Sequence, residues 1–164
     1  MGKIISIFNQ KGGVGKTTTS INLSAGLGKL GKKILLIDLD PQGNSTSGLG
    51  IEKSGVSHLI YDVLAMDIPI QDAIYNTTSE NVNIIPSNNE LAGLEIELAR
   101  VGDWEEILKD KLIDIKEDYD FIFIDCPPSL GILSVIGLIA SDSVIIPIQC
   151  EYYALEGLGQ LIHT

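Results

Sequence analysis

The sequence predicts a doubly wound α/β fold, in which helices cover both faces of a mostly parallel sheet. Short apolar runs rich in β-branched residues alternate along the chain with longer segments of helical periodicity. Several of these runs are apolar without alternation, which is typical of parallel strands covered on both faces. A length of 164 residues, with 45% hydrophobic and 20% charged side chains, suits one soluble domain. We therefore expect residues 1–164 to form a single domain.

The expected elements can be placed in order along the chain. A first strand leads through a glycine-rich loop into a helix that Gly31 ends. The expected strands are residues 3–8, 34–38, 82–86, 121–125 and 144–148. The expected helices are residues 16–30, a weak segment at 58–64, then 91–101, 104–115 with Asp103 as a candidate cap, 132–140, and one from 155 onward. Residues 41–50, rich in Gly, Ser, Thr and Asn, are expected to form a loop.

The charge of the chain is uneven, with a net value of −11. Residues 1–33 carry six lysines and no acidic residue, and all 22 acidic side chains follow. A basic strip beside a glycine-rich loop suits a phosphate-bearing ligand, whereas the acidic remainder argues against DNA binding by this segment alone. Two cysteines without metal-ligand spacing exclude a disulfide framework and favour a reducing cytoplasm.

The strongest motif is the glycine-rich loop between the first strand and the first helix. Glycines let successive backbone N–H groups converge on phosphate oxygens, and the helix N-terminus adds partial positive charge there. Lys16 is expected to reach the β- and γ-phosphates, and the Thr17 hydroxyl to bind Mg²⁺. The general P-loop pattern has glycine where this chain has Gln10, so the loop is a variant marked by a second lysine. The expected phosphate-binding residues are Lys11, Gly12, Gly13, Val14, Gly15, Lys16, Thr17 and Thr18.

Three aspartates follow strands of the predicted sheet. Asp38 and Asp40 lie at the end of the second strand, and Asp125 ends the fourth. Right-handed crossovers bring the loops after the first, second and fourth strands to one edge of the sheet, where ligands bind. A carboxylate there can hold Mg²⁺ directly or through water, and another can orient the attacking water in phosphoryl transfer. We predict Thr17, Asp38 and Asp125 at the metal, and Lys11, Lys16 and Asp40 in catalysis.

These motifs together resemble the deviant Walker A ATPases, and within them the ParA/Soj chromosome-partitioning family. The resemblance rests on residues 11–18, on Asp-Leu-Asp-Pro-Gln-Gly-Asn-Ser-Thr-Ser-Gly-Leu-Gly at 38–50, on Asp-Cys-Pro-Pro-Ser-Leu-Gly at 125–131, and on residues 147–157. It covers essentially the whole chain. It implies a P-loop fold that binds ATP and Mg²⁺, and it implies ATP hydrolysis. Family members commonly continue for several more helices, so we expect the C-terminal portion of the domain to be missing.

The resemblance also implies a switch between two assembly states. ATP would close two protomers face to face, with Lys11 reaching the partner's phosphates and Gly12 close to the dimer face. Asp40 would position the hydrolytic water, and Asp125 would support Mg²⁺ through water. The ATP-bound dimer would bind double-stranded DNA without sequence preference, mainly through residues beyond 164, and a ParB-type partner would stimulate hydrolysis. The protein would be cytoplasmic, on the nucleoid when ATP-bound, and not on a membrane.

Three other functions share this fold. A MinD-like ATPase that cycles on membranes during division-site placement has the same second lysine, although residues 41–44 favour partitioning. An iron–sulfur reductase would need suitably placed cysteines, but Cys126 adjoins Asp125 and Cys150 ends the last strand. An ATP-dependent amidating or ligating enzyme would need an acceptor pocket, for which the sequence shows no motif.

Overall fold

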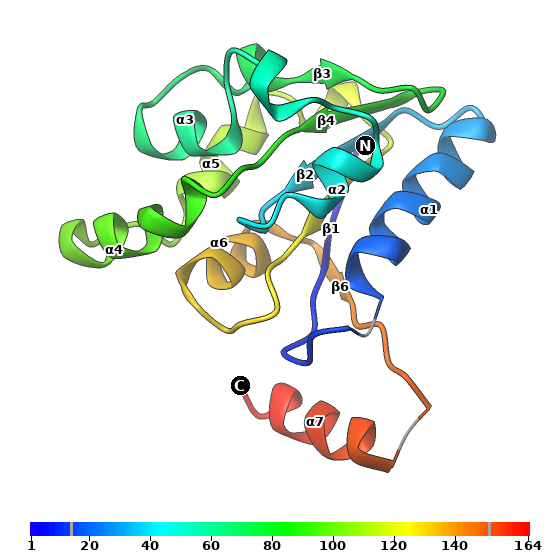
Figure 1. Ribbon diagram of the computed structural model, residues 1–164, viewed down its shortest axis with the longest axis vertical. Coiled ribbons are helices and arrows are strands. Elements are labelled where there is room, and N and C mark those ends of the chain that lie inside the picture. The colour runs from blue at the N-terminus through cyan, green and yellow to red at the C-terminus, as the bar shows by residue number, and fades with distance from the viewer. Residues whose placement is uncertain (14, 151) are drawn as a thin grey trace.

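A mostly parallel sheet with strand order β3-β4-β2-β5-β1-β6 organises the molecule (Figure 1). The structure is a computed structural model that describes residues 1–13, 15–150 and 152–164. Its strands are β1 (Lys3–Ile7), β2 (Ile34–Asp38), β3 (Tyr75–Asn76), β4 (Val82–Ile85), β5 (Phe121–Asp125) and β6 (Ser143–Ile145). Only β3 pairs antiparallel, against β4, among these described strands. The doubly wound, mostly parallel fold is therefore confirmed.

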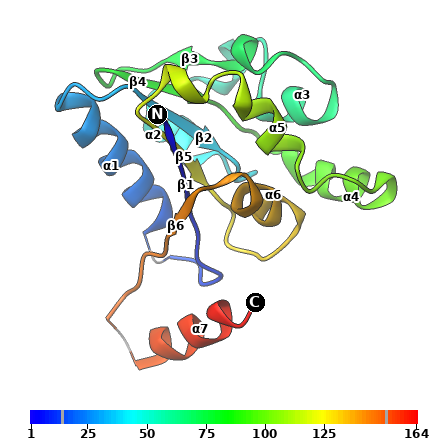
Figure 2. The same cartoon turned by 180° about the vertical axis from the view of Figure 1, so that it is seen from behind.

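Helices cover both faces of this sheet (Figures 1 and 2). They are α1 (Lys16–Lys29), α2 (Asn44–Gly48), α3 (Ile60–Ala65), α4 (Leu91–Val101), α5 (Ile107–Ile113), α6 (Ile132–Ala140) and α7 (Tyr152–Ile162). Short 3₁₀ turns occupy Lys53–Gly55, Ile70–Ala73 and Lys116–Asp118. Helix α1 lies on one face and α4, α5 and α6 on the other, while α7 lies beyond the carboxyl edge. None of the helices in the described ranges is long and apolar enough to span a bilayer.

The two faces have separate cores because successive strand residues point to opposite sides. Along β2, Ile34 and Leu36 pack with the α1 side, whereas Leu35 and Ile37 pack with α4, α5 and α6. All four side chains are fully buried, which explains why β2 is apolar without alternation.

Strands β1, β5 and β2 end at the same level. In the register, Asp125 lies opposite Ile7 on one side and opposite Asp38 on the other. The loops that follow these three strands therefore meet at the carboxyl edge of the sheet, as the crossover argument predicts.

The sequence-based element assignment was wrong in several places. Residues 41–50 are not all loop, because α2 forms within them. Asp103 does not cap α5, which begins at Ile107 after Gly102 and Asp103 turn the chain with positive φ angles of 75° and 52°. The short strand β3 was missed, β6 ends at Ile145, and α7 begins at Tyr152 rather than at residue 155.

Candidate functional site

A cavity of about 470 Å³ opens at the carboxyl edge, where β1, β2 and β5 end. It is lined by Gly12, Gly13, Gly15, Lys16, Thr17, Thr18, Asp40, Gln42, Asn44 and Pro128. Most of the predicted phosphate-binding residues thus line one cavity together with Asp40. Lys11 lines a different cavity of about 400 Å³ beside α7, and Val14 lies outside the described residues.

Backbone conformation explains why two positions of the loop are glycine. Gly13 and Gly15 have φ angles of 74° and 85°, in the left-handed region that side chains disfavour. Gly15 then caps α1 without a side-chain hydrogen bond, so the first amides of a 14-residue helix have no side-chain cap. The first turn of α1 contains no acidic residue, so its partial positive charge suits an anion. Gly12 is different, because a Cβ there would meet nothing within 4 Å.

Lys16 is the cation of the cavity. Its side chain is buried, with 7% of its surface exposed, and its Nζ donates to the Lys11 carbonyl oxygen at 3.4 Å. Burial lowers the pKa of Lys16, and the nearby Asp125 and Asp40 carboxylates oppose that shift. A partly desolvated ammonium interacts strongly with an anion that enters the cavity.

Asp125 lies at the base of the site. Its Oδ2 accepts hydrogen bonds from the hydroxyls of Thr17, at 3.0 Å, and Ser45, at 2.5 Å. Its Oδ1 is buried and has no hydrogen-bond partner among the described residues. Burial raises the pKa of Asp125, and the two hydroxyl hydrogen bonds partly offset this rise.

This arrangement fits a magnesium ion. Mg²⁺ prefers oxygen ligands, keeps several waters, and is usually held by one or two protein groups beside substrate phosphates. The Thr17 hydroxyl and the unpartnered oxygen of Asp125 are such groups, and a buried carboxylate oxygen without a donor is costly unless a cation or water satisfies it.

Asp38 is bonded within the protein on both carboxylate oxygens. Oδ1 accepts from the backbone N–H of Asp40 at 3.2 Å, and Oδ2 accepts from the N–H and hydroxyl of Thr46 at 2.9 and 2.7 Å. Burial, with a smaller contribution from the Asp125 charge, raises the pKa of Asp38 to about 7. Its role as a metal ligand stays a prediction, and its hydrogen bonds favour a positioning role instead.

Asp40 lines the cavity directly and is the predicted residue for orienting water. Its side chain is 8% exposed, and its Oδ1 accepts from the Gln42 N–H at 2.9 Å. Its carbonyl oxygen accepts from the Gly43 N–H, also at 2.9 Å. The carboxylate is therefore held at the cavity wall by the turn that follows it.

Sequence reasoning missed Ser45, Thr46 and Ser87, which bond to the three aspartates. Ser45 and Thr46 lie in the segment expected to be a loop, and α2 turns them inward until both are fully buried. Ser87 follows closely after β4 and donates to the Asp40 carbonyl oxygen at 2.7 Å. A polar residue just beyond a buried strand was the available signal, since the aspartates were found in this way.

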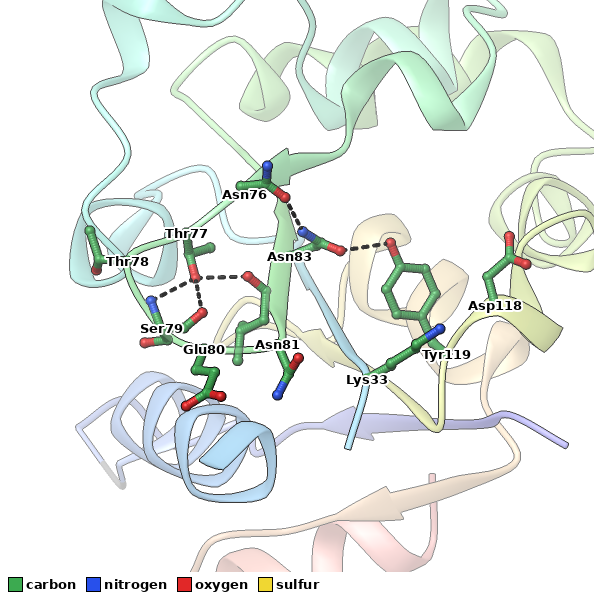
Figure 3. A pocket seen from close by; sticks show the side chains of 11 residues that line it. Lys33, Asn76, Thr77, Thr78, Ser79, Glu80, Asn81, Asn83, Asp118 and Tyr119 are labelled. Carbon is green, nitrogen blue, oxygen red and sulfur yellow. Dashed lines mark hydrogen bonds between the residues drawn. The ribbon is translucent and has the colours of Figure 1, made fainter. Parts of the chain in front are cut away.

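A second polar cavity, of about 620 Å³, lies at the amino ends of β2, β4 and β5 (Figure 3). The side chain of Asn83 donates to Asn76 at 2.8 Å and accepts from the Tyr119 hydroxyl at 3.1 Å. The Thr77 hydroxyl bonds to the backbone of Ser79 and Val82. These side chains bond to one another or to the backbone, and the cavity lies at the edge opposite to the predicted site.

Comparison with known proteins places the chain among partition proteins and relatives of the same fold. A family model described as "AAA domain" matches residues 2–164. The sporulation initiation inhibitor protein Soj of Bacillus subtilis (strain 168) is 60% identical over 164 residues, which are 100% of this chain and 65% of that protein. The chain thus spans 65% of the length of this curated relative.

Two solved structures have the same fold at substantial identity. A crystal structure of cobyrinic acid a,c-diamide synthase from Mycobacterium smegmatis, with bound ADP and magnesium, is 40% identical with a TM-score of 0.93. It matches 99% of this chain and 66% of that chain. A plasmid partition protein from Borrelia burgdorferi is 36% identical with a TM-score of 0.90, over 99% of this chain and 73% of that chain.

Proposed function

The chain belongs to the ParA/Soj family of P-loop ATPases, and from this premise we propose that it is the nucleotide switch of a chromosome- or plasmid-partitioning system. ATP binding would join two protomers, and hydrolysis would separate them. The observation that carries the proposal is the cavity at the carboxyl edge. Three features meet at this cavity. They are the buried side chain of Lys16, the first amides of α1, which have no side-chain cap, and the Asp125 carboxylate, which has an unpartnered oxygen.

The roles at ATP follow from these contacts. The loop amides and Lys16 would hold the phosphates, and Thr17 and Asp125 would hold Mg²⁺. When bound, the ion supplies positive charge that offsets the charge developing on the phosphoryl oxygens. Asp40, on the cavity wall, would accept a hydrogen bond from the attacking water and orient it. ATP and Mg²⁺ are therefore the expected ligands, in agreement with the ADP and magnesium bound by the M. smegmatis relative.

A second protomer would account for Lys11 and Gly12. Gly12 has open space around it, so no contact within the described chain requires glycine there. A partner closing over the loop would supply that requirement. Lys11 would then reach the partner's phosphates and stabilise their charge in the manner of an arginine finger in trans.

DNA and a ParB-type protein are the proposed partners of the assembled dimer. The plasmid partition protein from B. burgdorferi, at 36% identity, supports a partitioning role over the MinD-like alternative. Because the described chain is acidic after residue 33, we place the DNA surface mainly beyond residue 164. The protein would then act in the cytoplasm and lie on the nucleoid while it holds ATP.

Amidation is the competing function, because one structural relative is a diamide synthase at 40% identity. The 51% identity to the chromosome-partitioning ATPase Soj of Treponema pallidum (strain Nichols) favours partitioning. ATP turnover that rises severalfold when cobyrinic acid and an amide donor are added would favour the amidating function. Turnover that is indifferent to both would favour the switch.

Duplex DNA binding by the full-length protein carrying Asp40→Ala tests the proposal, with ATP and then with ADP at fixed salt. We expect ATP-dependent binding that is indifferent to sequence, because the variant keeps ATP without hydrolysing it. Lys16→Ala is the matched control and should not bind with either nucleotide. If Asp40→Ala formed dimers with ATP but did not bind DNA, the partitioning role would be contradicted. Lipid vesicles would then be the next partner to test.

A further inference from the structure

Ser87, which follows β4, is hydrogen-bonded to the main chain of Asp40. It lies shortly after β4, which two strands separate from β1 and its glycine-rich loop, and it is fully buried. Its hydroxyl donates to the Asp40 carbonyl oxygen at 2.7 Å. Its backbone N–H donates to the Thr46 hydroxyl oxygen at 3.0 Å. One residue thus bonds to both the start of the turn at 40–43 and the helix that follows it.

Thr46 and Asp38 complete this connection. The Thr46 hydroxyl donates to Asp38 Oδ2 at 2.7 Å while it accepts from Ser87, and Asp38 Oδ1 accepts from the Asp40 N–H. Asp38, Thr46 and Ser87 are all fully buried. The backbone N–H and carbonyl oxygen of Asp40 are therefore each bonded to this cluster, which we name the β4 bracket (Asp38, Thr46 and Ser87).

The turn after Asp40 is also packed against the bracket. Gly43 has a φ of 64°, and a Cβ there would lie 2.8 Å from the Ser87 carbonyl oxygen and 2.4 Å from Lys53 Nζ. Lys53 Nζ donates to the Gln42 carbonyl oxygen at 3.0 Å. The turn therefore has little room to shift while Ser87 is in place, and the Gln42 N–H stays bonded to Asp40 Oδ1.

We propose that Ser87, acting with Thr46, is a positioning residue that fixes the main chain of Asp40 and thereby aims its carboxylate. The inference rests on the proposed function, in which Asp40 orients the attacking water. Small displacements of a catalytic group lower rates strongly, while binding that depends on other groups is unaffected. Ser87 does not line the cavity, and the proposed phosphate-binding residues belong to the β1–α1 loop and the first turn of α1. Ser87 therefore affects kcat and not ATP affinity.

Ser87→Ala tests this inference, with Ser6→Ala as a matched control. Ser6 is also fully buried, and its hydroxyl also donates to a backbone carbonyl oxygen, that of Gly137 at 2.9 Å. It lies within β1 and does not line the cavity. Ser87→Ala loses one hydroxyl bond, whereas Ser6→Ala also loses a contact with the Ser141 hydroxyl at 2.5 Å, so the control should lose at least as much thermal stability. Only Ser87→Ala should lower kcat, by about tenfold, with the dissociation constant for ATP within about twofold of wild type.

Amide hydrogen exchange supplies a readout that does not depend on hydrolysis. In Ser87→Ala without nucleotide, the amides of Gln42 and Gly43 should exchange about tenfold faster, because their acceptors on Asp40 are less well held. In Ser6→Ala these two amides should exchange as in the wild type.

The outcomes separate the two proposals. Equal kcat in the two variants, or unchanged exchange at Gln42 and Gly43 in Ser87→Ala, would overturn the positioning role. A wild-type protein that binds ATP and does not hydrolyse it would instead overturn the proposed function, and the exchange result would still decide whether Ser87 holds the turn.

Discussion

The two edges of the sheet differ in whether their polar side chains have hydrogen-bond partners. At the carboxyl edge three aspartates are buried, two of them, Asp40 and Asp125, lie near Lys16, and one oxygen of Asp125 has no partner among the described residues. At the amino edge, Asn83 joins Asn76 to Tyr119 through two hydrogen bonds, and no buried side-chain atom of that described cavity lacks a partner. Both edges contain a sizeable cavity, and Figure 3 shows the one at the amino edge.

This contrast indicates what distinguishes a ligand-binding site from a polar cavity that is not one. Cavity volume does not do so, since the amino-edge cavity is larger, at about 620 Å³ against about 470 Å³. Buried charge without compensation and unmet hydrogen-bonding capacity do distinguish the two cavities. Such groups lower the stability of the folded protein, and they are retained where a ligand satisfies them. Substitutions at the carboxyl edge should therefore change ligand binding and catalysis, and those at the amino edge should change stability alone.

Lys16→Ala should have the largest effect. It removes the only described lysine that lines the carboxyl-edge cavity, and we expect ATP affinity to fall by about 100-fold or more. Titration calorimetry with Mg·ATP measures this, and sedimentation should show no ATP-driven dimer. ATP affinity within threefold of wild type would show that the cavity is not the phosphate site.

Asp125→Asn should separate stability from function. Because burial raises the pKa of Asp125 above its unfolded value, the folded state loses stability as pH rises through that pKa, and the ionised group destabilises the empty protein at neutral pH. The neutral amide should raise the melting temperature of the nucleotide-free protein by about 2–4 °C, equivalent to about 1 kcal/mol.

The same variant should lose most of the stabilisation that Mg·ATP gives to the wild type, because it lacks an oxygen that we propose to bind Mg²⁺. Thermal melts with EDTA and with Mg·ATP compare the two effects. A lower melting temperature in EDTA, with full stabilisation by Mg·ATP, would contradict the assignment of Asp125.

Asn83→Ala should act on stability alone. It removes the hydrogen bonds to Asn76 and to the Tyr119 hydroxyl, at a cost of about 1–2 kcal/mol in the free energy of unfolding. Urea denaturation measures that loss, and Mg·ATP affinity should equal that of the wild type. Weakened ATP binding would mean that the two edges are coupled.

The two cysteines should give the smallest effect. Cys126 is fully buried beside Asp125, and burial raises the pKa of its thiol to about 12, whereas Cys150 is exposed. Iodoacetamide at pH 8 should label Cys150 and leave Cys126 unmodified in the folded protein, since the thiolate is the reactive form. Peptide mass spectrometry reports the sites, and rapid labelling of Cys126 would show that the carboxyl edge opens more than the structure indicates.

The local sequence pattern was sufficient to predict strands that are continuous apolar runs. Strands β2 and β5 were predicted to the residue, because both form apolar runs buried on both faces. The aspartates at their ends followed from the same argument, since parallel strands bring their carboxyl ends to one edge.

Local pattern failed where long-range polar contacts determine the structure. The α2 sequence, Asn-Ser-Thr-Ser-Gly, is typical of turns, yet its Ser45 and Thr46 hydroxyls bond to aspartates at the ends of β5 and β2. Residues that prefer turns form a helix there because buried carboxylates need their donors. Ser87 was missed for the same reason, because its partners lie 41 and 47 positions away in the chain.

The most direct test of this account is the ATP hydrolysis rate of Asp40→Ala, measured beside Asn83→Ala at saturating Mg·ATP. We predict that Asp40→Ala binds ATP with near wild-type affinity and retains about 1% or less of the hydrolysis rate, while Asn83→Ala hydrolyses ATP at the wild-type rate. Wild-type turnover by Asp40→Ala would contradict the assignment of catalysis to the carboxyl edge.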